Sequence, residues 1–225
     1  MSKIITISRQ FGSGGARVGR AAAQRLGFQY ADREILSEAA RLLDVESVEL
    51  EPLEERSPSI WARIGTLFAQ GSPDVPFMPP MLPTVNETEL FAVERKVIEA
   101  IAARGDAVIV GRGAAHVLGG GHDVVRVFLH APLASRVALA MSEYGFGDRT
   151  EAERLTQESD RERARFAHAL TGRDWCDATL YDLTLNTDSV GLDRVVDLIV
   201  GIVQQAPTAS LPPVTPRTVE NRAAR

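Results

Sequence analysis

The sequence predicts an α/β fold in which helices flank a parallel sheet of five strands. Short apolar runs rich in β-branched residues alternate along the chain with longer segments that carry apolar residues at helical spacing. The strand-like runs occupy residues 4–7, 28–31, 107–110, 124–129 and 180–185. With 225 residues and 44% hydrophobic content, the chain can bury the core of one domain that also holds insertions.

The first predicted strand leads into a glycine-rich turn and then into a helix. Glycines at 12, 14 and 15 let the backbone take positive φ and bring several N–H groups close to an anion at the helix N-terminus. The helix itself is marked by Val18, Ala22 and Leu26 at helical spacing and by Gly27 at its end. This strand, turn and helix predict a phosphate-binding loop.

Two phosphate-loop motifs compete for this stretch. In the dinucleotide fingerprint G-x-G-x-x-G the third glycine falls on residue 17, which is Arg, although Asp32 lies near the position where that motif has its acid. In the mononucleotide P-loop G-x-x-x-x-G-K-[ST], residues 8–14 fill the loop. Gly15 then stands in place of the lysine, and Ala16 in place of the hydroxyl that binds magnesium.

The middle of the chain changes in character. Asp32 can cap a helix that extends to about residue 43, or it can lie beside Arg33 in the ligand crevice at the end of the second strand. Residues 44–85 contain an acidic run and a proline-dense stretch, which predict an insertion rather than core. A further helix is expected from about Asn86 to Gly105.

After the third strand, the sequence Gly111-Arg112-Gly113 stands where P-loop enzymes often carry an acid. Flanking glycines favour close approach of Arg112 to a ligand. Thr150 and Glu153 predict a capped helix that carries Arg161, Arg163 and Arg165; Arg161 and Arg165 share one face and Arg163 points roughly opposite. A closing helix is expected over residues 192–202.

Composition excludes several further classes of function. A formal net charge of −5 argues against a general nucleic-acid or anionic-membrane binder, and no segment approaches the roughly 20 apolar residues of a membrane helix. Cys176 is the single cysteine, and the N-terminus does not read as a signal peptide, so a cytoplasmic location is expected. Of the 25 basic residues, Lys3 and Lys96 are the only lysines. A cation that replaces the P-loop lysine is therefore expected to be an arginine, whose planar fork suits phosphate oxygens.

These features resemble the cytidylate kinase-like family, a divergent branch of the P-loop nucleoside monophosphate kinases. The resemblance spans about residues 3–204 and is carried by residues 5–15, 26–36, 108–113, 161–165 and 181–187. It implies a kinase-like domain over residues 1–204, in which 44–85 covers the monophosphate and 145–172 forms a lid. Residues 205–225 are predicted to be a disordered tail. Right-handed crossovers together with the strand–helix alternation predict the strand order 2-3-1-4-5.

The resemblance also implies transfer of the ATP γ-phosphate to a nucleoside monophosphate, with CMP a candidate acceptor. The expected donor-phosphate site is Gly12, Ser13, Gly14, Gly15 and Ala16 together with Arg9. Arg17 or Arg9 replaces the lysine, and Arg161, Arg163 and Arg165 neutralise the transferring group. Asp32, Arg33 and Arg112 are expected on the acceptor side, and Mg2+ is expected to be held mainly through the phosphates.

The alternative of a different class is a catalytically silent nucleotide-binding module, because the lysine, the loop hydroxyl and the strand-end acid are all missing. A dinucleotide ligand on the same loop is a third alternative. The expected partners are nucleotides, without nucleic acid or membrane, and the sequence gives no prediction of oligomeric state.

Overall fold

The computed structural model describes residues 3–32, 87–111, 113–118 and 123–205. Within these residues, five strands form one parallel sheet in the order β2-β3-β1-β4-β5. The strands are β1 (Lys3–Arg9), β2 (Gln29–Ala31), β3 (Ala107–Val110), β4 (Asp123–His130) and β5 (Leu183–Asn186). The predicted fold class and strand order are confirmed.

Strand β1 lies at the centre of the sheet. It pairs with β3 on one side, where Ile7 lies opposite Val110, and with β4 on the other, where Ile7 lies opposite Val127. Ile4, Ile5 and Ile7 are at most 1% exposed, which accounts for the unbroken apolar run in this strand. The glycine loop that follows β1 therefore opens at the middle of the sheet's carboxyl edge, where α/β proteins bind ligands.

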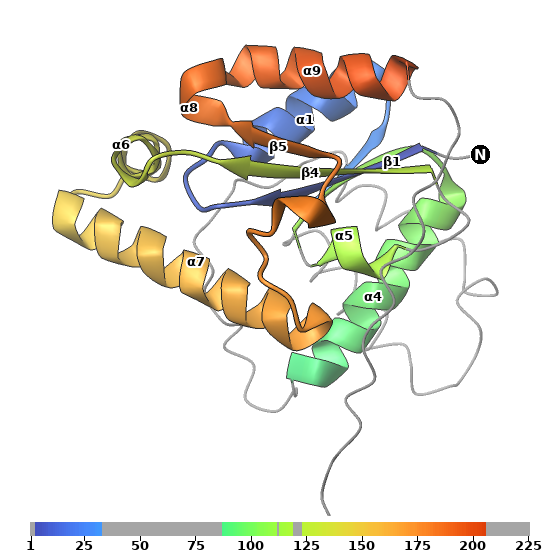
Figure 1. Cartoon of the computed structure of the whole chain (residues 1–225), viewed down its shortest axis with the longest axis horizontal. Helices are drawn as coiled ribbons and strands as arrows, with labels where there is room; N and C mark the ends of the chain where they lie inside the picture. Colours follow the sequence, from blue (N-terminus) through green and yellow to red (C-terminus); the bar gives the residue numbers. More distant parts are fainter. Residues whose placement is uncertain (1–2, 33–86, 112, 119–122, 206–225) are drawn as a thin grey trace, which may run out of the picture.

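Helices cover both faces of the sheet (Figure 1). On one face lie α1 (Gly15–Leu26) and α9 (Leu192–Gln205), whose buried side chains share a core with β1 and β4. On the other face lie α4 (Glu87–Arg104), α5 (Ala114–Val117) and α7 (Arg149–Thr171). The remaining helical elements are α6 (Leu133–Tyr144), the 3₁₀ turn η2 (Ala178–Leu180) and α8 (Thr187–Val190).

The alternation of side chains along β1 divides the core in two. Ile5 and Ile7 belong to the cluster with α1 and α9, whereas Ile4 belongs to the cluster with α4 and α5. By the same alternation, Ser8 continues the α5 side and Arg9 continues the α1 side. The two residues that end the strand thus point toward different neighbours.

Several predicted boundaries are confirmed and others need correction. The strand at 107–110 and the end of α1 before Gly27 are as predicted. The predicted cap of α7 by Thr150 and Glu153 is wrong, because Asp148 is the N-cap and its carboxylate accepts hydrogen bonds from Thr150 N and Glu151 N at 3.3 and 3.1 Å. The last strand begins at Leu183 rather than at residue 180, because residues 178–180 form the η2 turn.

The predicted helix that follows Asp32, the insertion 44–85 and the tail beyond residue 205 lie outside the described residues. Among the residues that are described, no helix is both long enough and apolar enough to cross a membrane.

Candidate active site

The glycine loop adopts the backbone conformation that its sequence predicts. Gly12 and Gly14 have φ values of 73° and 76°, in the left-handed region that glycine favours. A Cβ atom at residue 12 would overlap the backbone carbonyl oxygen of Arg136, so packing also requires glycine there. Gly14 is the N-cap of α1, and the first N–H groups of a helix have no carbonyl partner inside it. The loop can therefore present N–H groups to an anion.

Ser13 is fully buried within this loop. Its hydroxyl donates to the carbonyl oxygen of Gln10 at 2.8 Å, and Leu129 O lies within 3.4 Å. The hydroxyl thus holds the loop in shape. The N–H of Ser13 also donates to Gln10 O, at 3.3 Å, so both hydrogen-bond donors of this residue are used within the loop.

An ion pair between a buried arginine and a partly buried aspartate ties the loop to two helices. Arg136 on α6 donates from Nη1 to Asp160 Oδ2 on α7 at 2.6 Å and to Phe11 O at 3.0 Å. The other carboxylate oxygen of Asp160 accepts the N–H of Phe11 at 2.9 Å. Arg136 is 6% exposed, and its Nε donates to Ala131 O at 2.9 Å. One charged pair therefore fixes the loop, α6 and α7 relative to one another.

A pocket opens beside the loop at the carboxyl ends of β1 and β3. The other elements that form it are α5, the second half of α7 and the segment between α7 and β5. The lining residues are Ser8, Arg9, Gly111, Gly113, His116, Arg163, Phe166, Ala167, Trp175 and Tyr181.

Two arginines from distant parts of the chain meet in this pocket. Arg9, at the end of β1, is 7% exposed. Arg163, on α7, donates from Nη1 to the carbonyl oxygen of Arg9 at 3.3 Å, and its Cζ atom lies 5.6 Å from the centre of the Phe11 ring. Two arginines that line one pocket beside a glycine loop favour an anionic ligand with several oxygens.

Aromatic side chains also line the pocket. The ring of Tyr181 stacks on Phe128 with centroids 5.0 Å apart, and its hydroxyl donates to Trp175 O at 2.8 Å. Burial raises the pKa of Tyr181 to about 12, so the phenol stays protonated. The segment between α7 and β5 is thus fixed to the sheet beside the pocket.

His116 lies edge-on to Tyr181, with ring centroids 6.5 Å apart. Burial, with a smaller contribution from the nearby Arg126 and Arg173, lowers the pKa of His116 from 6.5 to about 4. The imidazole is therefore neutral at pH 7 and can donate or accept a hydrogen bond without adding charge.

Arg126 holds the short helix that carries His116. Although it lies within β4, it is 7% exposed and donates from Nε to Ala115 O at 3.0 Å and from Nη2 to Leu118 O at 3.3 Å. These bonds satisfy carbonyl groups of α5 and of the residue that ends it. Arg126 therefore positions the α5 side of the pocket without lining it.

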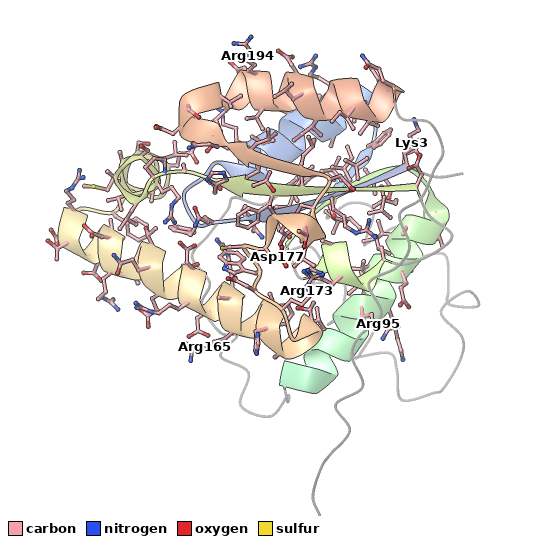
Figure 2. All side chains as sticks on the ribbon, in the orientation of Figure 1. Lys3, Arg95, Arg165, Arg173, Asp177 and Arg194 are labelled. Atoms are coloured by element: carbon pink, nitrogen blue, oxygen red, sulfur yellow. The ribbon has the colours of Figure 1, made fainter. Side chains whose placement is uncertain are left out.

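The remaining sequence-predicted residues lie elsewhere or cannot be placed. The side chain of Arg17 is 60% exposed and lies 4.0 Å from Glu143, outside the pocket lining. Arg161 is exposed, and Arg165, which pairs with Glu162, points away from the sheet (Figure 2). Asp32 is 4% exposed at the end of β2, while Arg33 and Arg112 lie outside the described residues.

Sequence reasoning missed several polar and aromatic residues of this region, among them Arg126, Arg136, Asp160, His116 and Trp175. Arg126 gave a signal, because it is a lone charge within the apolar run Val124-Val125-Arg126-Val127-Phe128. Asp160 gave none, because it stands in a helix with many charges and its partners are distant in sequence.

The chain belongs to the cytidylate kinase-like family, whose model matches residues 4–189. A solved structure of an uncharacterized protein from Eubacterium ventriosum has the same fold, with a TM-score of 0.66, 19% sequence identity, and coverage of 91% of this chain and 99% of that one. A gluconokinase structure from Sinorhizobium meliloti gives a TM-score of 0.49 at 13% identity, over 90% of this chain and 92% of that chain.

A curated relative, a uronate isomerase from Corynebacterium glutamicum, is 36% identical over 110 residues. This match covers 47% of the present chain and 20% of the isomerase, so the chain spans about a fifth of that protein's length. Family membership supports a phosphotransferase in general and the use of nucleotides.

Proposed function

We propose that the protein transfers the γ-phosphate of ATP to a nucleoside monophosphate, with CMP the first acceptor to test. The observation that carries this proposal is the meeting of Arg9 and Arg163 in a pocket beside the glycine loop. Phosphoryl transfer needs few covalent contributions from the protein. It needs alignment of the donor and acceptor and cations around the transferring group.

The loop is proposed to hold the donor phosphates through backbone N–H groups of residues 12–16, with Mg2+ carried mainly by phosphate oxygens and water. An oxygen of the acceptor phosphate attacks the γ-phosphorus, and the bond from that phosphorus to the β–γ bridging oxygen breaks, which releases ADP. Arg9 and Arg163 neutralise charge on the transferring group. Magnesium shields the β- and γ-oxygens when it is bound.

The acceptor is proposed to enter the pocket from the side of β3 and α5. Gly111 and Gly113 line that side, and Arg112 between them is assigned to the acceptor phosphate by the family resemblance. Asp32 and Arg33 are assigned to the same side by their position after the second strand. The aromatic wall of Phe166, Trp175 and Tyr181 offers an apolar surface to the rest of the acceptor.

Fewer arginines are proposed to contact the phosphates than the sequence suggested. Arg161 and Arg165 are exposed. Arg163, which stands between them in the sequence, lines the pocket. We therefore assign the lid contact to Arg163. We assign the charge that replaces the lysine to Arg9 rather than to Arg17, which lies outside the pocket lining.

The second candidate function is a silent nucleotide-binding module. The observation that favours it is the hydrogen bond from the N–H of Phe11 to the carboxylate of Asp160. This carboxylate already satisfies one backbone donor of the loop, which is then not free for a phosphate.

The third alternative, a dinucleotide site, fits less well. In the dinucleotide-binding fold the second strand pairs with the first, whereas here β3 lies between them.

The test is a phosphotransfer screen with ATP, Mg2+ and each of the common nucleoside monophosphates, read as ADP formation that depends on the acceptor. The kinase proposal expects acceptor-dependent ADP with at least one monophosphate. Binding of ATP without transfer to any acceptor favours the silent module, and absence of ATP binding overturns both.

A further inference from the structure

The positions of the basic residue and the glycine in this loop are reversed relative to the P-loop motif. In G-x-x-x-x-G-K the first glycine stands five residues before the second, and the lysine follows the second directly. When Gly14 is taken as the second glycine, the first position holds Arg9 and the lysine position holds Gly15. The loop thus has an arginine where the motif has its first glycine, and a glycine where the motif has its lysine.

The stem of Arg9 lies against the backbone of Gly15. A Cβ atom built at residue 15 would lie 2.6 Å from Cγ of Arg9, 3.1 Å from its Cβ and 3.2 Å from its Cδ. These atoms belong to the inner part of the side chain, which cannot move aside as a flexible tip can. No side chain fits at residue 15 while Arg9 keeps this position.

The alternation along β1 explains why Arg9 reaches Gly15. Arg9 is on the same side of the strand as Ile5 and Ile7, which belong to the core shared with α1. Gly15 is the first residue of α1. An arginine at the end of β1 is therefore directed across the loop toward the place where the P-loop lysine would begin.

The guanidinium end of Arg9 is confined by a second glycine. Gly111, which follows β3, has a φ of 87°, and a Cβ atom there would overlap Nη1 of Arg9 and lie 3.2 Å from its Cζ. The N–H of Gly111 donates to Ile7 O at 3.0 Å, which fixes this glycine next to β1. The guanidinium therefore lies next to Gly111, and both residues line the pocket.

We propose that Arg9 and Gly15 are an exchanged pair, in which Arg9 supplies the cation for the donor polyphosphate from the first position of the loop. Gly15 is glycine because the stem of Arg9 occupies the space of a side chain there. The ligand part of this proposal rests on the proposed function, whereas the packing part stands without it. The expected ligand class is the triphosphate of a nucleoside, whose oxygens match the planar fork of arginine.

The packing part is tested by a double-mutant cycle on thermal stability without ligand. Gly15→Lys alone is expected to lower Tm by roughly 5 °C or more, because it overpacks the space beside Arg9. In the Arg9→Gly background, the same Gly15→Lys substitution is expected to cost no more than about 2 °C. Gly147→Lys is the matched control, since a Cβ atom at Gly147 meets nothing within 4 Å. Equal Tm losses for Gly15→Lys in both backgrounds, or a loss no larger than in the control, overturn the packing claim.

The ligand part is tested by the affinity for ATP with Mg2+, measured by calorimetry on the full chain. Arg9→Met keeps the length of the stem and removes the charge, so it is expected to weaken binding by about tenfold or more. Arg9→Gly combined with Gly15→Lys is expected to bind more tightly than Arg9→Gly alone, because it restores a cation from the original motif position. Unchanged affinity in Arg9→Met overturns the ligand part.

If the wild-type protein binds ATP but transfers no phosphate, the proposed function fails while both parts of this inference remain measurable. If it binds no ATP, the ligand part falls as well, and the Tm cycle still decides the packing part.

Discussion

Arg136 and Asp160 form an ion pair of 2.6 Å whose two members come from different helices and both bond the backbone of Phe11. Asp160 accepts the N–H of Phe11, and Arg136 donates to the carbonyl oxygen of the same residue. The nitrogen and the oxygen of Phe11 belong to the two peptide units on either side of its Cα atom, so the pair restrains the rotation of both units. The shape of the glycine loop is therefore fixed by α6 and α7 as well as by its own glycines.

Asp160→Asn is expected to destabilise the protein by ~1–3 kcal/mol, because it leaves the buried Arg136 guanidinium without its counter-charge. Urea unfolding measures this loss. Glu158→Gln on the same helix is the control: its side chain is 48% exposed and pairs with Arg154, so a change within about 0.5 kcal/mol is expected. Equal losses in the two variants would contradict the structural role given to Asp160.

A comparison of Gly111→Ala with Gly27→Ala distinguishes the effect of backbone strain from the effect of displacing the Arg9 side chain. Both glycines have positive φ, 87° and 70°, so each alanine should cost about 1 kcal/mol of stability. A Cβ atom at Gly27 meets nothing within 4 Å, whereas one at Gly111 overlaps the tip of Arg9. Gly111→Ala alone should also weaken ATP binding, by about tenfold as the guanidinium moves. Calorimetry on both variants is the measurement, and equal affinities would refute the confinement of Arg9 by Gly111.

His116 makes a contribution to the pH dependence of stability with a defined sign. Its folded-state pKa of about 4 lies below the ordinary value of 6.5, so between these values the unfolded chain binds more protons. The free energy of unfolding should therefore fall as the pH drops from 6.5 toward 4, by at most ~3 kcal/mol from this residue, and stay level above pH 7.

The measurement is denaturant unfolding at several pH values, with the wild type compared with His116→Gln. The variant should lose part of the decline below pH 6.5, while His168→Gln, at an exposed position on α7, should keep all of it. A decline of the same size in all three proteins would show that His116 does not titrate as a buried neutral group.

Tyr181→Phe tests the aromatic wall. The substitution keeps the ring that stacks on Phe128 and removes the hydroxyl that donates to Trp175 O at 2.8 Å. A loss of about 1 kcal/mol is expected, because the partly buried carbonyl of Trp175 loses its donor. Tyr181→Ala should cost at least about 3 kcal/mol, since it also removes the ring. Thermal unfolding of both variants measures the difference, and equal losses would mean that the ring packing contributes nothing.

The strand order could be predicted from sequence because it depends on local patterns and on the handedness of crossovers. The apolar runs, the glycine at the end of α1 and the position of the loop are all local features. The start of α7 was predicted wrongly because two candidate caps stand close together. Asp148 accepts from two N–H groups of the first turn, which Thr150, already inside the helix, cannot do.

The site could be predicted only in part. The sequence left Arg9 and Arg17 as alternatives, although the alternation from Ile5 and Ile7 already directs Arg9 toward α1. The contacts of Asp160 with Phe11 and Arg136 could not be predicted, because they depend on how α6 and α7 cross the end of the sheet. Long-range polar contacts of this kind leave no periodic pattern in the chain.

The central claim is that Arg9 is the cation of a phosphotransferase that lacks the P-loop lysine. The most direct measurement is transfer of labelled γ-phosphate from ATP to the best acceptor of the monophosphate panel, compared among the wild type, Arg9→Met and Arg17→Met. Transfer should fall by at least about tenfold in Arg9→Met, the loss of an oriented charge contact of more than about 1.4 kcal/mol, and stay within about twofold of wild type in Arg17→Met. A loss confined to Arg17→Met, or a wild-type protein that binds ATP and labels no acceptor, would contradict the claim.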